Sequence, residues 1–579
     1  MHNKIDLSNK RLVLIILLGI CVLLYANSLG GAFISDDVSA IARNPTLGKS
    51  LNYWMEPASL LNSLNYLIAG YNPFTYHLTS ILLHSLNTIF AFFFLKLFFG
   101  AEASFLGAAI FAVHPIHTEA VSWISGKPYL VFSAFILGNA LLYQRIAEDK
   151  KRFRPLAYLL SLAIFYYMTL RYYTYYLFPF FLILIDITLE RTRRTWRLWI
   201  PFFFLMALKF AAIKFAVISR IHLLSGESGV VEPIWNNPIL TMAHSLFSNL
   251  SLVFWPLKLT LYHEPIIVSR SILSCEVVLL FVLIGSLRFI FKKERVIFFA
   301  ILFFILFITP TFSPFAISWL IAERYLYLPS LSLSILAAFI YSRYGGRSPG
   351  LRKKIILLFV LIAAAYALRT ILRNEDWSTP SRFWRQELKV SSGSASVHNK
   401  MGDIYRQEGR FKEAIEELNK ALAIKPKDAN AYNNLGVTYS EMGDKNAAVI
   451  YYRKAIDSNL KFAEAYFNLG NAYAALGRKE EAASSYRKAI ELNQSFLEAY
   501  INLGVAYQDL GNSAEAIIAY QKVLEINPKI AIAHNNLAVA YYQEKEYGMA
   551  MKHLDLAVKF GYTVNPEFSR SLEPYRKTQ

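Results

Sequence analysis

The chain has 579 residues, of which 55% are hydrophobic and 17% are charged. Soluble domains carry about 25% charged residues, so this composition excludes a single soluble globular domain. The formal net charge is +19, and nearly all of the excess lies in residues 1–390, in short segments between long apolar runs. Membrane topology explains that distribution better than a nucleic-acid-binding surface does. The two cysteines lie inside apolar runs and provide neither a disulfide framework nor a metal site.

The first 375 residues contain apolar runs whose lengths are typical of membrane-spanning helices. The first run, 12–29, follows three basic residues and has no small-residue cleavage site, which favours an uncleaved helix over a signal peptide. Further spans are predicted at 76–99, 101–113, 128–146, 155–170, 174–189, 198–217, 272–291, 296–310, 324–341 and 354–373. Polar residues and a proline interrupt 240–256, so we expect a re-entrant or interfacial segment there and about eleven spans in total.

Basic residues form four clusters between the predicted spans, at 150–154, 191–197, 292–295 and 343–354. Because cytoplasmic loops are enriched in Lys and Arg, we expect all four clusters and the N-terminus in the cytoplasm. An odd number of spans then places the segment after residue 390 in the periplasm or a lumen. The loops expected on the same side are 30–75, 114–127, 218–271 and 311–323. The absence of cysteine from these outer segments favours a bacterial inner membrane over the endoplasmic reticulum.

After residue 390 the sequence changes to a helical repeat. Small residues and tyrosines each recur every 34 residues, in the sets Gly402, Gly436, Gly470, Gly504, Ala538 and Tyr405, Tyr439, Tyr473, Tyr507, Tyr541. This period, with small residues where paired helices cross, is the tetratricopeptide pattern. We therefore predict an all-α protein with a polytopic membrane helix bundle (1–375), a linker (376–394), an α-solenoid of five tetratricopeptide repeats (395–564) and a C-terminal tail (565–579).

Two adjacent acidic residues, Asp36 and Asp37, lie just beyond the first predicted span, in the outer loop 30–75. Adjacent carboxylates beside a membrane are costly unless they contact water, a metal or a partner, which makes them candidates for function. They could act as a general base or bind a hard divalent cation such as Mg²⁺ or Mn²⁺. The alternative is a helix cap in a solvated turn.

The second outer loop combines His114, His117 and Glu119. Two histidines and a carboxylate could bind zinc, but Pro115 disrupts the regular helical face that such a site would use. We expect these three residues, together with Glu323, to line a wet cavity instead.

Positive charge is scarce on the predicted outer side, so Lys127, Arg171 and Arg324 are candidate ligand-binding residues. All three lie near outer membrane boundaries, where the phosphate of a lipid-linked substrate would be. Alternatively, each is an interfacial residue whose charged end reaches the headgroup region.

Four asparagines recur at one position of the first helix in successive repeats: Asn434, Asn468, Asn502 and Asn536. That helix lines the concave groove of such solenoids, so we predict a ladder of amides that binds the backbone of an extended acceptor polypeptide. The alternative is a repeat consensus without a ligand.

Several motifs of the first unit carry a family resemblance. They are NSLGGAFISDDVSAIARNP (27–45), YHLTSILLHSLNTIFAFF (76–93), FAVHPIHTEAVSWISGKP (111–128) and AERYLYLPSL (322–331). Together with the repeats, they resemble the transmembrane and tetratricopeptide-repeat protein O-mannosyltransferases, which have the type C glycosyltransferase fold. The resemblance implies transfer of a sugar, commonly mannose, from a polyprenyl-phosphate donor to a Ser or Thr hydroxyl of a protein on the outer face. It also implies that Asp36 and Asp37 match the paired acidic residues with the catalytic role.

The sequence departs from the family in two places. Tyr172 and Tyr173 replace a Lys-Glu pair that members often have, and residues 126–129 read Gly-Lys-Pro-Tyr where many read Gly-Arg-Ala-Asp. Fewer acidic groups are compatible with a different donor, a metal-free mechanism or lost activity. The alternative function is a non-catalytic membrane scaffold that recruits outer-face proteins through its repeats. A transporter has little support, because no inverted repeat is apparent.

Overall fold

The computed structural model describes residues 9–34, 37, 41, 47, 56–148, 155–208, 238–257, 259–260, 270–311 and 321–576. Asp36 lies outside these residues. Two compact units divide the chain, Met1–Ser391 and Ser392–Gln579. All regular secondary structure in the described ranges is helical, which confirms the predicted all-α class.

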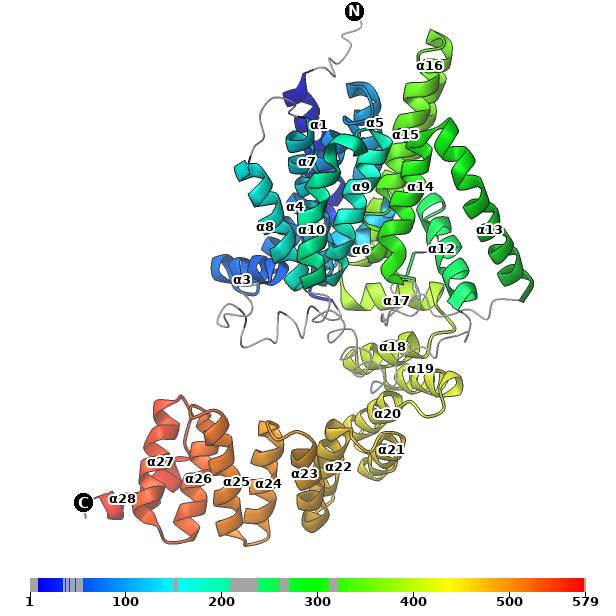
Figure 1. Ribbon diagram of the computed structural model, residues 1–579. Helices are drawn as coiled ribbons and strands as arrows, with labels where there is room; N and C mark the ends of the chain where they lie inside the picture. The colour runs from blue at the N-terminus through cyan, green and yellow to red at the C-terminus, as the bar shows by residue number, and fades with distance from the viewer. Residues whose placement is uncertain are drawn as a thin grey trace, which may run out of the picture. The chain divides into compact units, whose positions relative to one another are not determined.

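The first unit is a helix bundle (Figure 1). Its helices are α1 (Lys10–Tyr25), α3 (Pro57–Ala69), α4 (Pro73–Leu95), α5 (Ala101–Val113), α6 (Thr118–Ser122), α7 (Lys127–Glu148), α8 (Pro155–Arg171), α9 (Phe178–Thr188), α10 (Thr192–Leu208), α12 (Pro238–Phe254), α13 (Arg270–Lys293), α14 (Arg295–Ile308), α15 (Leu331–Tyr344), α16 (Pro349–Asp376) and α17 (Pro380–Val390). Within the described ranges, five helices are long and apolar enough to cross a membrane, and five shorter helices are also apolar. These helices support a membrane protein. The count of about eleven spans is not confirmed, and the orientation stays a prediction.

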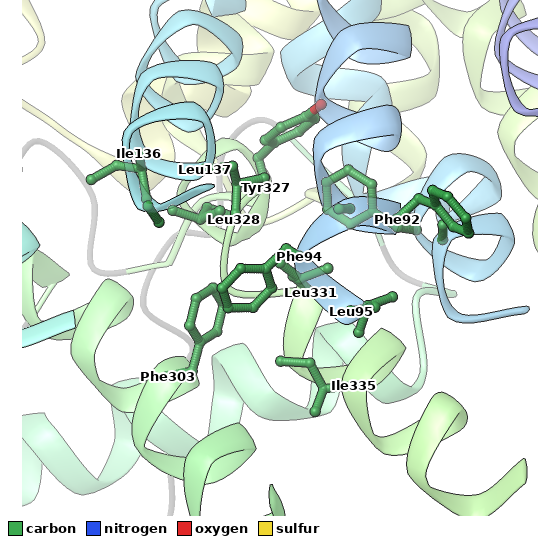
Figure 2. Packing of buried hydrophobic residues seen from close by; sticks show 14 of the residues in the cluster. Phe92, Phe94, Leu95, Ile136, Leu137, Phe303, Tyr327, Leu328, Leu331 and Ile335 are labelled. Carbon is green, nitrogen blue, oxygen red and sulfur yellow. The ribbon is translucent and has the colours of Figure 1, made fainter. Parts of the chain in front are cut away.

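Aromatic rings from α4, α9 and α14 fill the centre of the bundle. The ring centroid of Phe94 lies 5.7 Å from that of Phe181 and 6.4 Å from that of Phe303. Figure 2 shows Phe94 and Phe303 beside Leu331 and Ile335 of α15. Tilted ring pairs at these separations add to the dispersion energy of the packed core. This packing holds together the helices whose ends carry the polar residues described below.

A short helix, α3, forms inside the predicted outer loop 30–75. Glu56 caps it, because its two carboxylate oxygens accept hydrogen bonds from the backbone N–H groups of Ala58 (3.2 Å) and Ser59 (2.5 Å). Both α3 and α17 lie across the direction of the long helices (Figure 1). The apolar periodicity of the spans gave no signal for α3, whose formation depends on this cap and on packing against α4 and α7.

Two other segments refine the sequence prediction. The interrupted segment 240–256 forms most of α12, a regular helix of 17 residues, and whether it crosses a membrane stays a prediction. The predicted span 324–341 begins with a short 3₁₀ helix, η7 (Glu323–Leu326), and α15 starts only at Leu331. The buried Glu323 and Arg324 of η7 therefore precede the helix and do not lie within it.

The second unit consists of five helix pairs and a final helix. The pairs are α18 (Ala395–Gln407) with α19 (Phe411–Ile424), α20 (Ala429–Glu441) with α21 (Lys445–Ser458), α22 (Ala463–Ala475) with α23 (Lys479–Leu492), α24 (Leu497–Asp509) with α25 (Ser513–Ile526), and α26 (Ala531–Gln543) with α27 (Tyr547–Lys559); α28 (Pro566–Arg576) follows. This arrangement agrees with the tetratricopeptide pattern. The residue limits predicted for the linker, the repeats and the tail stay predictions.

Glycines allow the two helices of a repeat to approach closely. In three repeats, a Cβ atom added at the glycine would lie only 2.4–2.6 Å from a tyrosine ring. The pairs are Gly436 with Tyr452, Gly470 with Tyr486 and Gly504 with Tyr520. The periodic small residues of the sequence therefore leave room for a buried aromatic ring.

Candidate active site

Asp37 joins the segment after α1 to the turn before α7. Its side chain is buried, and Oδ1 accepts hydrogen bonds from the backbone N–H (2.7 Å) and the hydroxyl (2.5 Å) of Ser125. Oδ2 accepts a third bond, from the backbone N–H of Ile34 at 3.2 Å. Burial raises the pKa of Asp37 to about 6, although these hydrogen bonds and the charge of Lys127 oppose the shift. A carboxyl group with such a pKa can exchange protons near neutral pH.

Lys127 is a buried cation close to this loop. It is the first residue of α7, and its Nζ donates a 2.6 Å hydrogen bond to Oδ1 of Asn62 on α3. The Nζ also lies 5.3 Å from the ring centroid of Tyr76 on α4, a cation–π separation. An electrostatic interaction joins Lys127 to Asp37. A basic and an acidic group thus lie in one buried cluster, fixed by α3, α4 and α7.

Arg324 of η7 is held in one orientation by Glu119 of α6. Its guanidinium group forms an ion pair with Oε1 of Glu119, and its backbone N–H donates a 2.7 Å hydrogen bond to Oε2. The guanidinium carbon lies 5.5 Å from the ring centroid of Trp123 and 5.1 Å from that of Tyr325. A carboxylate and two aromatic rings therefore preorganise this cation.

Arg171 and Arg324 line the same cavity, which has a volume of about 290 Å³. Arg171 ends α8, and its Nε is buried without a hydrogen-bond partner among the described atoms. Most of the remaining wall is aromatic or aliphatic and includes Phe132, Leu177 and Phe307. A cavity with two guanidinium groups and apolar walls suits an anion that carries an apolar chain.

Of the three basic residues that the sequence predicts to bind a ligand, only Arg171 and Arg324 share a cavity. Lys127 does not belong to the cavity wall, although its neighbour Pro128 does. Tyr172, at one of the two positions of the family departure, also lines the cavity and donates a hydrogen bond from its hydroxyl to Glu56. The carboxylate of Glu56 is therefore one side chain away from the cavity.

His114 and His117 lie inside the bundle. Nε2 of His114 is 2.9 Å from the carbonyl oxygen of Val253, and Nε2 of His117 is 2.8 Å from the hydroxyl of Ser330. Burial lowers the pKa of His114 to about 4 and that of His117 well below its ordinary value. Both are therefore neutral hydrogen-bonding groups at neutral pH.

Glu323 belongs to a buried charge network around Arg373 of α16. Nη2 of Arg373 lies 3.4 Å from Glu323 and 3.3 Å from Glu387 of α17. None of the four residues predicted to line a cavity, His114, His117, Glu119 and Glu323, belongs to the wall described above, and that role stays a prediction. The described residues contain no group of three His, Cys, Asp or Glu side chains that could hold a metal ion.

The predicted asparagine ladder uses part of its hydrogen-bonding capacity between repeats. Nδ2 of Asn434, Asn468 and Asn502 donates to another asparagine of the preceding first helix, at 2.9, 3.0 and 2.9 Å respectively. Asn536 instead accepts a 3.2 Å bond from its neighbour in sequence. These amides are half-buried, and acceptor binding by them stays a prediction.

Sequence reasoning missed two residues that position the buried cluster, Ser125 and Asn62. Ser125 lies inside the family motif 111–128, but no sequence spacing indicates that its hydroxyl and its backbone N–H donate hydrogen bonds to Asp37. Asn62 lies in α3, a helix that was not predicted. A signal for either would have required knowledge of the loop conformation.

Known proteins are similar to both units. Tetratricopeptide-repeat models match residues 402–443, 429–462, 470–511 and 497–530. Human protein O-mannosyl-transferase TMTC3 is 27% identical over 482 residues, which cover 73% of this chain and 52% of the relative. The Caenorhabditis elegans protein O-mannosyl-transferase F38B6.6 is 24% identical over 459 residues, 71% of this chain and 63% of the relative. A crystal structure of MamA, at 31% identity and a TM-score of 0.27, covers 28% of this chain and 94% of MamA.

The chain spans about half the length of the human relative. The match nevertheless covers nearly three quarters of this chain, and the tetratricopeptide matches fall within the second unit. Over most of its length, the chain is therefore similar in sequence to protein O-mannosyl-transferases.

Proposed function

We propose that the chain is a membrane glycosyltransferase that moves a sugar, mannose by analogy with the names of its relatives, to Ser or Thr hydroxyls of proteins. The donor is a polyprenyl-phosphate-linked sugar, and the acceptor protein lies on the periplasmic or lumenal face. The curated relatives named above come from eukaryotes, whereas the absence of outer cysteines favours a bacterial membrane, so the compartment is part of the proposal.

The observation that carries this proposal is the cavity shared by Arg171 and Arg324. Arg171, whose buried Nε has no hydrogen-bond partner among the described residues, and Arg324, which Glu119 fixes, provide donors for a phosphate group. The aromatic and aliphatic wall suits the polyprenyl chain. Because the phosphate leaves with its negative charge, the same two guanidinium groups would stabilise the transition state as well as bind the donor.

The acidic loop supplies the candidate base. In the proposed reaction, Asp36 or Asp37 removes the proton from the acceptor hydroxyl, whose oxygen attacks the anomeric carbon as the bond to the lipid phosphate breaks. This in-line displacement inverts the anomeric configuration. Asp36 and Asp37 could also bind a divalent cation such as Mg²⁺ or Mn²⁺, which would supply positive charge beside the departing phosphate.

The repeats would bind the acceptor polypeptide. The concave face of a repeat solenoid is an extended binding surface, and amides at a fixed position of each repeat can bond a peptide backbone without reading its sequence. Asn434, Asn468, Asn502 and Asn536 are the candidate contacts. A solenoid with this role would present unstructured polypeptide segments to the acidic loop.

The test is sugar transfer by the full chain reconstituted in lipid nanodiscs with polyprenyl-phosphate-mannose and an unfolded, Ser- and Thr-rich acceptor. Mass spectrometry would detect hexose on the acceptor. We expect Asp36→Asn with Asp37→Asn to abolish transfer, and Arg171→Gln or Arg324→Gln to raise the KM for the donor about 10–100-fold, the effect of one charged hydrogen bond. Arg352→Gln is the matched control, because Arg352 pairs with Glu102 away from the cavity.

Two outcomes would contradict the proposal. Transfer that persists in the double Asp variant would remove the catalytic role of the acidic loop. Absence of transfer by the unaltered chain, with intact donor and acceptor, would favour the alternative of a non-catalytic scaffold that recruits outer-face proteins through its repeats.

A further inference from the structure

A hollow of about 260 Å³ opens on the solenoid between α22, α23 and α24. Asn471 and Ala474 of α22 line one side, and Asn502 and Asp509 of α24 line the other. Lys479, the first residue of α23, lies at the rim. The exposed side chains of Ala474 and Asp509 show that the hollow is open to solvent.

Comparison of the repeats shows why the hollow forms at this place. The position of Ala474 carries Arg406, Ser440, Gln508 and Tyr542 in the other repeats, each 34 residues apart. All four of those side chains are larger than a methyl group. The hollow is therefore a feature of the third repeat that the repeat pattern itself does not require.

The wall residue Asn471 also distinguishes this repeat from most of the others, although the first repeat has the polar Asp403 at the equivalent position. The position of Asn471 carries Val437, Val505 and Val539 in three other repeats. Oδ1 of Asn471 accepts hydrogen bonds from the hydroxyl of Tyr486 (2.7 Å) and from Nδ2 of Asn502 (2.9 Å). Both amides are thereby fixed by a single carbonyl oxygen.

These bonds use neither the amide nitrogen of Asn471 nor the amide oxygen of Asn502. In the described part of the chain, Nδ2 of Asn471 and Oδ1 of Asn502 have no hydrogen-bond partner, and both residues line the hollow. Nζ of Lys479 donates a 3.0 Å bond to the backbone carbonyl of Asp509, and both residues line the hollow, so its lining carries one charge of each sign. A ligand that complements this wall is neutral, and it both donates and accepts hydrogen bonds.

We propose that this hollow is a subsite that takes one neutral, hydrogen-bonding side chain, Ser, Thr, Asn or Gln, of an extended acceptor polypeptide. The proposal rests on the proposed acceptor-binding role of the repeats and adds a side-chain preference to it. Asn502 and its equivalent in the preceding repeat, Asn468, would bind the peptide backbone beside the hollow. The backbone bonds alone are independent of sequence, whereas the subsite favours segments rich in hydroxyl or amide side chains.

The test measures peptide binding without donor lipid, so its result does not depend on catalysis. Fluorescein-labelled decapeptides of Gly and Ala with one central Gln, Ser, Leu or Glu are titrated with the full chain in nanodiscs, and fluorescence polarisation gives the Kd. We expect the Gln and Ser peptides to bind about tenfold more tightly than the Leu and Glu peptides, because one or two neutral hydrogen bonds are gained.

Two single substitutions test the location. Ala474→Gln should fill the hollow and remove the preference for Gln and Ser, and the fold tolerates it because Gln508 occupies the equivalent position of the next repeat. Ala475→Gln is the matched control: Gln407 and Gln543 occupy its equivalent positions, and Ala475 does not line the hollow. Asn471→Val, which reproduces Val505, should also remove the preference.

Three results would overturn the subsite. They are equal binding of the Leu and Gln peptides by the unaltered chain, an equal loss in the Ala474→Gln and Ala475→Gln variants, and no measurable binding of any peptide. Selective peptide binding by a chain that transfers no sugar would support the subsite while contradicting the proposed enzymatic function.

Discussion

Substitution of Gly504 by Ala tests the close packing inside a repeat. The added methyl group would lie 2.4 Å from Cε1 and 2.6 Å from Cζ of Tyr520. The ring cannot move freely, because Tyr520 is fully buried and its hydroxyl donates a 2.6 Å hydrogen bond to Gln508. Overpacking of this kind costs about 1–3 kcal/mol, and displacement of the hydroxyl costs about 1 kcal/mol more.

The helix propensity of alanine offsets part of that cost, by about 1 kcal/mol relative to glycine. The net loss of stability is therefore about 1–3 kcal/mol. For a unit of this size each kcal/mol lowers Tm by about 2–4 °C. Gly393→Ala is the control, because its methyl group would meet nothing within 4 Å, and it should leave Tm unchanged.

The two units can be followed separately in one protein. All 9 tryptophans precede residue 392, so tryptophan fluorescence reports on the first unit, whereas far-UV circular dichroism reports on both. In Gly504→Ala we expect the circular-dichroism transition of the repeats to fall by about 2–12 °C while the fluorescence transition stays in place.

A second substitution identifies the cause of the shift. Gly504→Ala combined with Tyr520→Leu reproduces Ala538 and Leu554, the buried pair at the equivalent positions of the last repeat. If the methyl–ring clash is responsible, the double variant is more stable than the sum of the single effects by about 1–3 kcal/mol. Additive effects, or a single Gly504→Ala variant as stable as the unaltered chain, would refute the reasoning.

Three further predictions concern single residues. Lys545 has φ +64°, whereas glycines occupy the equivalent positions of the other repeats, so Lys545→Gly should raise the stability of the repeats by about 1 kcal/mol in a thermal melt. Glu119→Gln breaks a buried ion pair with Arg324 and should destabilise the first unit by about 3–5 kcal/mol, read by tryptophan fluorescence. The pKa of Asp37 rises to about 6 on folding, so its protonation favours the folded state at low pH. That contribution, about 3 kcal/mol, is lost as the pH rises from about 4 through 6, and Asp37→Asn should abolish the loss in a pH series of Tm.

Long-period signals allowed much of the architecture to be predicted. The 34-residue recurrence of Gly470 and Gly504 predicts paired helices because each small residue serves one helix crossing, a local and repeated requirement. The apolar runs likewise predict the long helices of the bundle from composition alone. Neither signal reaches α3, whose start depends on a cap by Glu56, nor the late start of α15 at Leu331.

The candidate site was predictable as a set of residues and not as an arrangement. The low number of basic residues on the predicted outer side indicated Lys127, Arg171 and Arg324 as candidates. Only the packing of η7, α7 and α8 determines that Arg171 and Arg324 share a cavity while Lys127 donates a hydrogen bond to Asn62. Such contacts join segments that are far apart in the sequence. They produce no periodic pattern, so a single sequence does not predict them.

The two arginines of the cavity differ in a way that bears on binding. Arg324 is already neutralised by Glu119, whereas the buried Nε of Arg171 has no hydrogen-bond partner in the part of the chain that the structure describes. A buried donor without an acceptor costs about 1–3 kcal/mol in the ligand-free state. An anion bound in the cavity would remove that cost by accepting the Nε hydrogen bond. The relief of this cost would therefore contribute to the affinity of the anion. Arg171→Gln should therefore weaken donor binding more than it changes stability, while Glu119→Gln should do the reverse.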